Sequence, residues 1–251
     1  MLSIGSWIAA PRPDPRVHVR LFCFPCAGGG ASRFASWPAR LAPVVEACPV
    51  QLPGREERLG EPPFTRLGPL VDALVDALEG HLEKPFALFG HSLGALIAFE
   101  LTRALRRTKK PLPVHLFVSA YRAPHLPDPV PPLHDAPLPV FREELRRLNG
   151  TPSEVLENEE LMRLLEPTLR ADFALHETHI HAQEPPLSCP VSVFGGLQDG
   201  EVDRDMLAEW RRHTDRSFTM RLFPGDHFFI DSAEGLLLEA IAGDLARAPR
   251  R

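Results

Sequence analysis

The sequence lacks the features that would place the protein in a membrane or outside the cell. No apolar run approaches the ~20 residues that a bilayer-spanning helix needs. Residues 1–7 have neither the basic segment nor the apolar core of a secretory signal peptide. We therefore expect a cytoplasmic protein with no membrane partner.

Positive charge and cysteine are also scarce. The 28 Lys and Arg residues stand against 33 Asp and Glu, a net charge of −5, which argues against nucleic acid as a partner. Of the four cysteines, Cys23 and Cys26 form a Cys-x-x-Cys, but glycines follow where a thioredoxin-like motif would open a helix. We expect reduced cysteines that pack in the core or in loops.

Signatures of metal and phosphate sites are missing as well. The glycines at 28–30 precede no Gly-Lys-Ser/Thr, which a phosphate-binding loop needs. His176, His179 and His181 lie close in sequence, but no Cys cluster and no His-Glu-x-x-His accompanies them. The sequence therefore predicts neither a metal nor a cofactor.

What the chain does contain is Gly-His-Ser-Leu-Gly at 90–94, between an apolar run at 86–89 and a helical stretch at 95–105. A buried strand that passes directly into a helix needs a sharp turn. Glycines two before and two after the serine remove the Cβ atoms that would clash there. Such a nucleophile elbow exposes Ser92 at its apex, and we interpret the neighbouring His91 as structural.

A serine nucleophile needs a base and an acid that orients the base. In α/β enzymes of this kind the order along the chain is Ser, then Asp or Glu, then His, each on a loop that follows a strand. Two late predicted strands run into such loops, at Asp199 and at His227. Asp203 is better placed as the first residue of the next helix. The predicted catalytic triad is therefore Ser92, Asp199 and His227.

Two backbone amides are candidates for an oxyanion hole. The Leu93 N–H lies at a helix N-terminus, where free donors and the helix dipole favour negative charge. The glycine-rich loop after the first predicted strand lets backbone come close to a substrate, and there we choose the Ala27 N–H.

Strands and helices alternate along most of the chain. This pattern predicts an α/β fold with a mostly parallel sheet covered by helices on both faces, and the spacing favours one domain over 1–251. The predicted strands cover 17–24, 47–52, 86–89, 114–119, 190–194 and 218–223; the predicted helices cover 36–45, 67–81, 95–105, 203–213 and 233–247.

An insertion at about 123–186 interrupts the alternation. Prolines forbid regular structure through Pro139, and amphipathic stretches follow at 140–148 and 153–174. Long insertions of this sort are usually functional, so we predict a mobile, partly helical lid. Its apolar residues indicate a pocket that places no charged residue to read one substrate; they are Leu145, Leu148, Leu161, Leu164 and Leu165.

Five segments together resemble the type II thioesterases, stand-alone α/β-hydrolases that accompany nonribosomal peptide and polyketide synthases. The resemblance extends to the lid, at 122–127 and 169–173, and departs from the family at Cys26, where an aromatic residue or His is usual. The segments are 24–30, 52–58, 90–94, 195–199 and 225–229. The stretch at 53–59 could also be only a solvated loop.

The resemblance implies an α/β-hydrolase fold with a lid. It also implies hydrolysis of acyl or aminoacyl thioesters from the phosphopantetheine arm of acyl or peptidyl carrier proteins, which removes stalled or misloaded units from a synthase. The arm belongs to the partner and is not a cofactor. Carriers are generally acidic, so the basic clusters at 103–110 and 142–147 are candidate docking surfaces. We expect a monomer.

Two alternatives stay open. A general carboxylesterase or lipase would use the same triad with a different leaving group and no protein partner. A non-catalytic acyl-binding relative would fail to react with a fluorophosphonate probe. The acyl group, the pathway and the carrier are not specified by the sequence.

Overall fold

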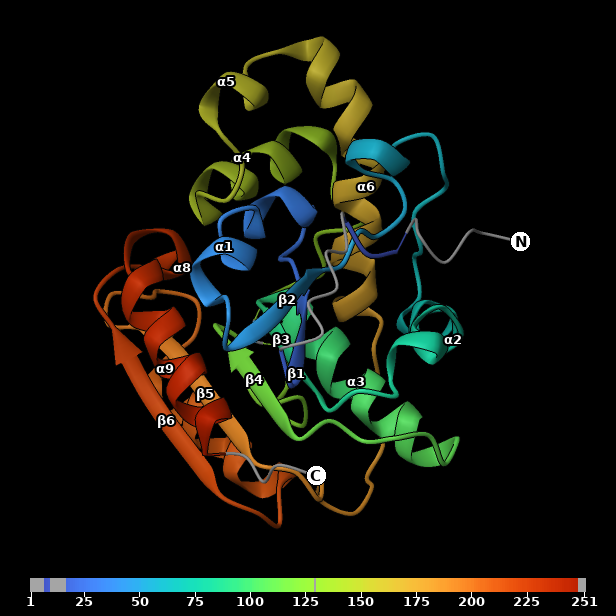
Figure 1. Ribbon diagram of the computed structural model, residues 1–251. Helices are drawn as coiled ribbons and strands as arrows, with labels where there is room; N and C mark the ends of the chain where they lie inside the picture. Colours follow the sequence, from blue (N-terminus) through green and yellow to red (C-terminus); the bar gives the residue numbers. More distant parts are fainter. Residues whose placement is uncertain (1–6, 10–16, 129, 248–251) are drawn as a thin grey trace.

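The computed structural model describes residues 7–9, 17–128 and 130–247. Six parallel strands form one sheet in the order β2-β1-β3-β4-β5-β6 (Figure 1). Because every pair is parallel, all carboxyl ends meet at one edge, as expected for strands joined by helices. The strands are β1 (Val19–Phe24), β2 (Val45–Pro49), β3 (Phe86–His91), β4 (His115–Ser119), β5 (Val191–Gly196) and β6 (Phe218–Phe223).

Helices cover both faces of the sheet, which confirms the predicted layers. One face carries α1 (Trp37–Leu41), α8 (Phe229–Ser232) and α9 (Glu234–Ala246); the other carries α2 (Leu67–Leu78), α3 (Leu93–Arg107) and α7 (Arg204–Ala208). Short 3-10 helices are η2 (Ala31–Phe34), η3 (Glu56–Arg58), η4 (Glu79–His81) and η5 (Glu209–His213).

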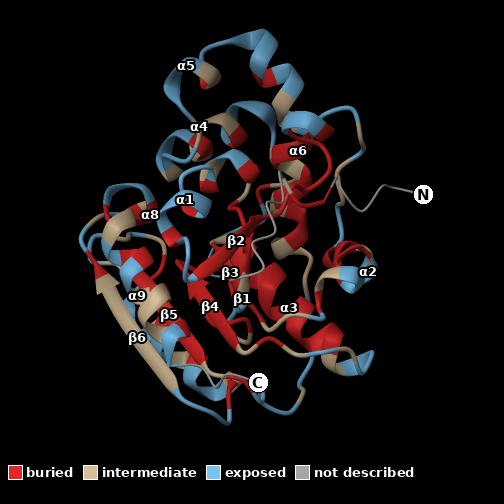
Figure 2. Cartoon of the chain, viewed as in Figure 1, coloured by how far each residue is buried: buried red, intermediate tan, exposed pale blue. Residues whose placement is uncertain are grey.

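The central strands read as continuous apolar runs because both of their faces are buried. In β3, Phe86 and Leu88 pack with α2 and α3, whereas Ala87 and Phe89 pack on the opposite side with α1 and α9. Figure 2 shows the central strands and most of α3 as the buried centre of the molecule, whereas β6 at the edge of the sheet is only partly buried.

Several predicted boundaries are wrong by a few residues. The helix predicted at 36–45 ends at Leu41, because Pro43 cannot continue it, and β2 already begins at Val45. The predicted strand at 47–52 accordingly starts earlier and ends at Pro49. The stretches at 67–81 and 203–213 each divide into an α-helix followed by a 3-10 helix, whereas the helix predicted at 233–247 is present as α9.

The insertion forms α4 (Leu138–Leu148), α5 (Ser153–Leu156) and α6 (Glu159–Glu177). In Figure 1, α4 and α5 lie at the top, and α6 runs from there down toward the sheet. It has a small core of its own, made of Leu133, Phe141, Leu145, Leu156, Met162 and Leu169. Two leucines predicted to face the pocket, Leu161 and Leu164, are instead 40% and 51% exposed. Near the end of α6, Leu175 belongs to the main core beside α3.

No helix in the described ranges has both the length and the apolarity needed to cross a membrane. The cysteines are free thiols and buried, as expected from the sequence. Burial raises the pKa of Cys48 and of Cys189 to about 12, so both stay protonated and unreactive.

Candidate active site

Ser92 sits at the sharp turn between β3 and α3. Its backbone is held at φ +53° and ψ −121°, a conformation that few non-glycine residues adopt. The two flanking glycines are required by close approach: a Cβ on Gly90 would fall on the carbonyl of Gly94, and a Cβ on Gly94 would fall on the carbonyl of Phe24. The predicted elbow is therefore present.

The imidazole of His227 links Ser92 to Asp199. Its Nε2 lies 3.1 Å from Ser92 Oγ, and its Nδ1 lies 3.0 Å from Asp199 Oδ2. With Nδ1–H donated to the carboxylate, the Nε2 lone pair is free to accept the serine proton. The structure thus brings together the predicted triad, whereas Asp203 caps α7 by accepting from the Met206 N–H at 2.8 Å.

The acid is fixed by its own loop. The side chain of Asp199 is fully buried, and its Oδ1 accepts the backbone N–H groups of Glu201 and Val202 at 2.8 and 3.1 Å. This leaves Oδ2 for the imidazole. The loop of the acid is bound to the loop of the base: Gln198 N–H donates to the Gly225 carbonyl at 2.9 Å, and Gly225 N–H donates to Gln198 Oε1 at 2.7 Å.

The two amides chosen from the sequence border the same cavity as Ser92. Neither the Ala27 nor the Leu93 N–H donates to any residue that the structure describes. Gly29 N–H donates to the Cys26 carbonyl at 3.0 Å, and Gly28 has φ +71°, as in a type II turn. In a trans peptide the N–H points opposite to the C=O, so this bond turns the Ala27 N–H away from the inside of the turn.

A cavity of about 310 Å³ lies over Ser92, between the sheet edge and the insertion. Leu145, Leu148 and Phe173 give it an apolar wall. The expectation that the lid places no charged residue at the pocket is wrong, because three ion pairs bring charge to the border of the cavity. These are Arg147 with Glu144 and Glu201, and Arg122 with Asp128.

His91 lies behind the triad and is fully buried. Its Nδ1 is 2.9 Å from Ser119 Oγ, and its ring centroid is 5.6 Å from that of His227. Burial, reinforced by the charge that His227 and Arg33 can carry, holds the pKa of His91 well below its usual range. A neutral ring beside the base fits the structural role that we assigned to it.

Sequence reasoning missed two buried arginines in the loop that follows β2. Arg55 and Arg58, in the stretch that could have been a solvated loop, are only 5% and 3% exposed. Arg55 pairs with the buried Asp172 of α6. The available signal was that both segments, at 52–58 and 169–173, are among those that carry the family resemblance.

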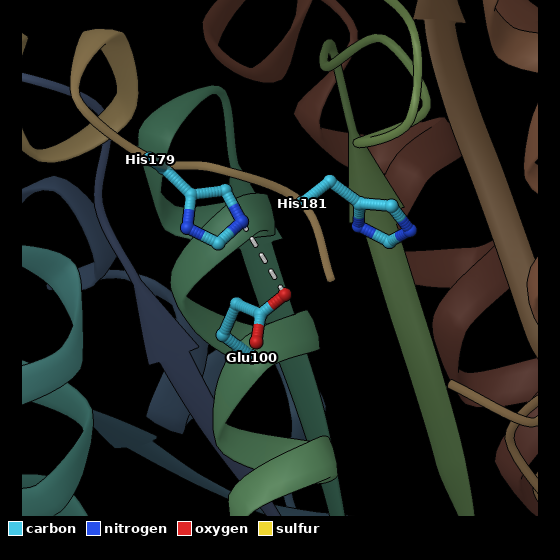
Figure 3. Close-up of side chains that lie close together, drawn as sticks. All are labelled: Glu100, His179 and His181. Carbon is cyan, nitrogen blue, oxygen red and sulfur yellow. Dashed lines mark ion pairs between the residues drawn. The ribbon is translucent and has the colours of Figure 1, made fainter. Parts of the chain in front are cut away.

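Glu100, His179 and His181 form the candidate metal cluster among the described residues (Figure 3). Their potential ligand atoms lie within 4.8 Å of one another, and His179 Nε2 is 3.5 Å from Glu100 Oε1. However, the buried guanidinium of Arg103 donates to the same Glu100 Oε1 at 2.6 Å. A fixed positive charge at low dielectric opposes a dication, so we assign no metal here. His176 lies elsewhere, 3.6 Å from Asp128.

The basic clusters expected to dock carriers are largely neutralised within the chain. In the first, Arg103 is buried, Arg106 and Arg107 both pair with Glu184 at 2.8 Å, and Lys110 pairs with Glu79. The second cluster is likewise paired, Arg142 with Glu159 and Arg146 with Glu143. Arg103 is therefore not available for docking.

Comparisons with known proteins agree with this geometry. A family model described as a thioesterase domain matches residues 19–248. The chain is 43% identical over 247 residues to linear gramicidin dehydrogenase LgrE of Brevibacillus parabrevis, covering 97% of this chain and 94% of that protein.

Two solved structures have the same architecture. The RedJ thioesterase of the prodiginine pathway in Streptomyces coelicolor matches with a TM-score of 0.84 and 40% identity, covering 93% of this chain and 91% of RedJ. BorB, a type II thioesterase of the borrelidin biosynthetic cluster, matches with a TM-score of 0.86 and 36% identity, covering 96% of this chain and 98% of BorB. These matches confirm the predicted α/β-hydrolase fold.

Proposed function

Because the chain belongs to the thioesterase family and its matched structures include a type II thioesterase, we propose that it hydrolyses acyl or aminoacyl thioesters on the phosphopantetheine arm of carrier proteins. Ser92, His227 and Asp199 perform the reaction. One observation carries the assignment: the Ser92–His227–Asp199 relay opens into an apolar-walled cavity beside two unengaged amides.

In the first half of the reaction, Ser92 Oγ attacks the thioester carbonyl while its proton passes to His227 Nε2. A C–O bond forms, and the carbonyl electron pair becomes an oxyanion that accepts the Ala27 and Leu93 N–H groups. Asp199 stabilises the imidazolium. When the oxyanion collapses, the C–S bond breaks and the sulfur takes the proton from His227.

In the second half, water takes the place of the thiol. His227 Nε2 accepts a proton from water as the water oxygen attacks the acyl carbonyl. When the oxyanion collapses, the C–O bond to Ser92 breaks, Ser92 Oγ takes the proton back from His227, and the carboxylic acid leaves. A thiol has a pKa near 8.5, far below that of an alcohol, so a thioester needs less help at the departure step than an oxygen ester does.

The carrier partner is inferred from the chemistry of the arm and from the relatives. A cavity of this size, bounded by the insertion, can hold an acyl chain while the arm enters from outside. Since most of the basic residues at 103–110 and 142–147 are already paired, we expect the charge of the carrier to affect the association rate more than the turnover.

Two other reactions are weighed against this one. The name of LgrE indicates a redox reaction for that protein. In this chain the cavity presents a hydroxyl backed by an imidazole and a carboxylate, which is the apparatus of acyl transfer. A general esterase would use the same residues, so only the leaving group and the partner separate it from a thioesterase.

The test compares kcat/KM for one acyl group carried by a carrier protein, by coenzyme A, by a simple thiol and by the matching oxygen alcohol. Each is measured at low and at high salt, with Ser92→Ala as the inactive control. We expect the carrier-bound thioester to be preferred, with a preference that weakens in salt. Equal rates on all four substrates would overturn the proposal in favour of the general esterase.

A further inference from the structure

A buried ion pair connects the loop after β2, which carries Arg55, to Asp172 of helix α6, and it lies beside the turn that carries Ala27. Arg55 Nη2 lies 2.8 Å from Asp172 Oδ1, and Arg55 Nη1 lies 2.8 Å from Asp172 Oδ2, a two-pronged contact. The side chains are 6% and 1% exposed. Replacing such a pair by apolar residues is often neutral or stabilising, so net stability alone is a weak reason for its presence.

The pair holds the turn at 26–29 from both sides. The Gly28 N–H donates to Asp172 Oδ2 at 2.7 Å, and Arg55 Nη1 donates to the Gly29 carbonyl at 3.1 Å. The remaining anchor is the turn's own bond from Gly29 N–H to the Cys26 carbonyl. The peptide planes on both sides of Ala27 are therefore fixed, and with them the direction of its N–H.

Packing leaves the turn little room to shift. A Cβ placed on Gly28 would lie 2.6 Å from Leu169 Cδ2, so the backbone is pressed against α6. Thr168 lies one helical turn before Asp172 on α6. Its Oγ1 donates to the Gly54 carbonyl at 2.6 Å, which holds the residue before Arg55. Helix α6 thus contacts both loops that meet at the ion pair, the turn at 26–29 and the loop at 54–55.

We propose that Arg55 and Asp172 are positioning residues that hold the Ala27 N–H where the oxyanion develops. Neither is placed to act on the substrate itself. This inference rests on the proposed hydrolysis through Ser92, and it adds that the oxyanion hole depends on a lid helix. Since Phe173, next to Asp172, borders the cavity, the same helix contributes to the cavity wall and holds the turn that carries the oxyanion donor.

Two variants test the role of the pair. Asp172→Asn keeps an oxygen for the Gly28 N–H but weakens the contact with Arg55, so kcat should fall about 3- to 10-fold. Arg55→Met combined with Asp172→Leu removes both charges without leaving one buried alone, and kcat should fall about 10- to 100-fold, less than the loss of a whole oxyanion donor. KM should stay within about 3-fold, since ground-state binding is untouched.

The matched control is Glu46→Gln. Glu46 is a buried carboxylate, 7% exposed, that pairs with Arg20 at 3.2 Å near the amino ends of β1 and β2, the opposite end of the strands from Ser92. It should lower the melting temperature without lowering kcat. A loss of kcat in the double variant no larger than in Glu46→Gln would overturn the proposal, as would an effect confined to KM.

Repeating Asp172→Asn in a variant that lacks the Ala27 N–H shows whether the pair acts through Ala27. Proline is favoured at the second position of a type II turn, so Ala27→Pro removes the N–H while keeping the turn. We expect it to lower kcat about 10²- to 10³-fold, the usual cost of one oxyanion donor. In that background Asp172→Asn should cost less than about 2-fold, because the group it positions is gone. A full additional loss would contradict the positioning role.

The failure of this inference can be told from the failure of the proposed function. Every variant is assayed on the thioester and on the matching oxygen ester, and its labelling rate with a fluorophosphonate is measured. If the wild-type protein cleaves only the oxygen ester, the thioesterase proposal fails. The ratio of variant to wild type on that ester, and in labelling, still reports on Arg55 and Asp172.

Discussion

The carboxyl edge of the sheet and the insertion above it hold their polar side chains in opposite ways. At the edge, Asp199 is fully buried and accepts two backbone amides and the imidazole. In the insertion, charged pairs such as Arg146 with Glu143 lie on the surface, where an ion pair adds little stability. The catalytic acid is thus held by buried hydrogen bonds, whereas the ion pairs on α4 face solvent.

Helix α6 crosses the boundary between the two regions. Its early residues include the exposed Leu161 and Leu164, whereas Asp172 and Leu175 are buried against the sheet domain. The mobile lid predicted at 123–186 is therefore better divided: α4, α5 and the start of α6 rest on a small core of their own, and the end of α6 is part of the main body.

The largest effect should come from the rigid edge. Asp199→Asn should lower kcat by about 10³- to 10⁴-fold, because the amide no longer fixes the tautomer of His227 or stabilises its charge. Single-turnover kinetics with an acyl thioester measures the loss. Asp203→Asn is the control and should stay within about 3-fold, since the Asp203 side chain only caps α7. The opposite order would make Asp203 the acid.

An intermediate effect should come from the core of the insertion. Phe141 is fully buried there and packs edge-to-face against Phe173, with the ring centroids 5.9 Å apart. Phe141→Ala should lower the free energy of local opening of α4 and α5 by about 3–5 kcal/mol. Hydrogen exchange should then speed up in those helices and not in the strands.

The control for that change is Leu164→Ala, whose side chain is 51% exposed. It should alter the free energy of opening by less than about 0.5 kcal/mol. Equal acceleration of exchange in β3 and β4 after Phe141→Ala would show that insertion and sheet unfold as one unit, and the division of the two regions would be lost.

The smallest effect is the loss of folding stability at acid pH that comes from a buried histidine of the sheet. His115, at the start of β4, is 7% exposed and lies 2.9 Å from Ser192 Oγ. Burial lowers its pKa to about 4. Below the unfolded pKa of about 6.5 the unfolded chain takes up the proton first, so stability falls with pH until about pH 4, by roughly 2 kcal/mol between pH 7 and pH 5.

Urea titrations of wild type and of His115→Gln at both pH values measure this term. The glutamine can still donate to Ser192 and does not titrate. It should therefore lose about 2 kcal/mol less stability on going from pH 7 to pH 5. An identical loss in both proteins would mean that His115 accepts its proton in the folded state.

The sequence predicted the site where backbone rules alone decide it. Gly90, Ser92 and Gly94 specify an elbow by sterics, and parallel strands bring their following loops, and hence Asp199 and His227, to one edge. The architecture of the sheet followed from the same alternation of apolar strands and helices.

The predictions that were wrong concern residues whose environment depends on contacts between distant segments. Arg55 could be interpreted as part of a solvated loop because its partner Asp172 lies 117 residues away in the sequence. The same holds for the border of the cavity, where Arg147 meets Glu201. Local composition can show that a residue is charged, but whether it is solvated or buried is settled only when the insertion folds onto the sheet.

Helix α6 also suggests where the protein can be redesigned. Thr168 and Asp172, four residues apart, lie on the side that holds the two loops, whereas Phe173, His176 and Glu177 border the cavity. A combinatorial library confined to those three cavity positions would vary the acyl preference while leaving the reaction machinery in place. Selection for turnover would remove substitutions at Thr168 and Asp172. Substrate range and catalytic competence can therefore evolve separately along one helix.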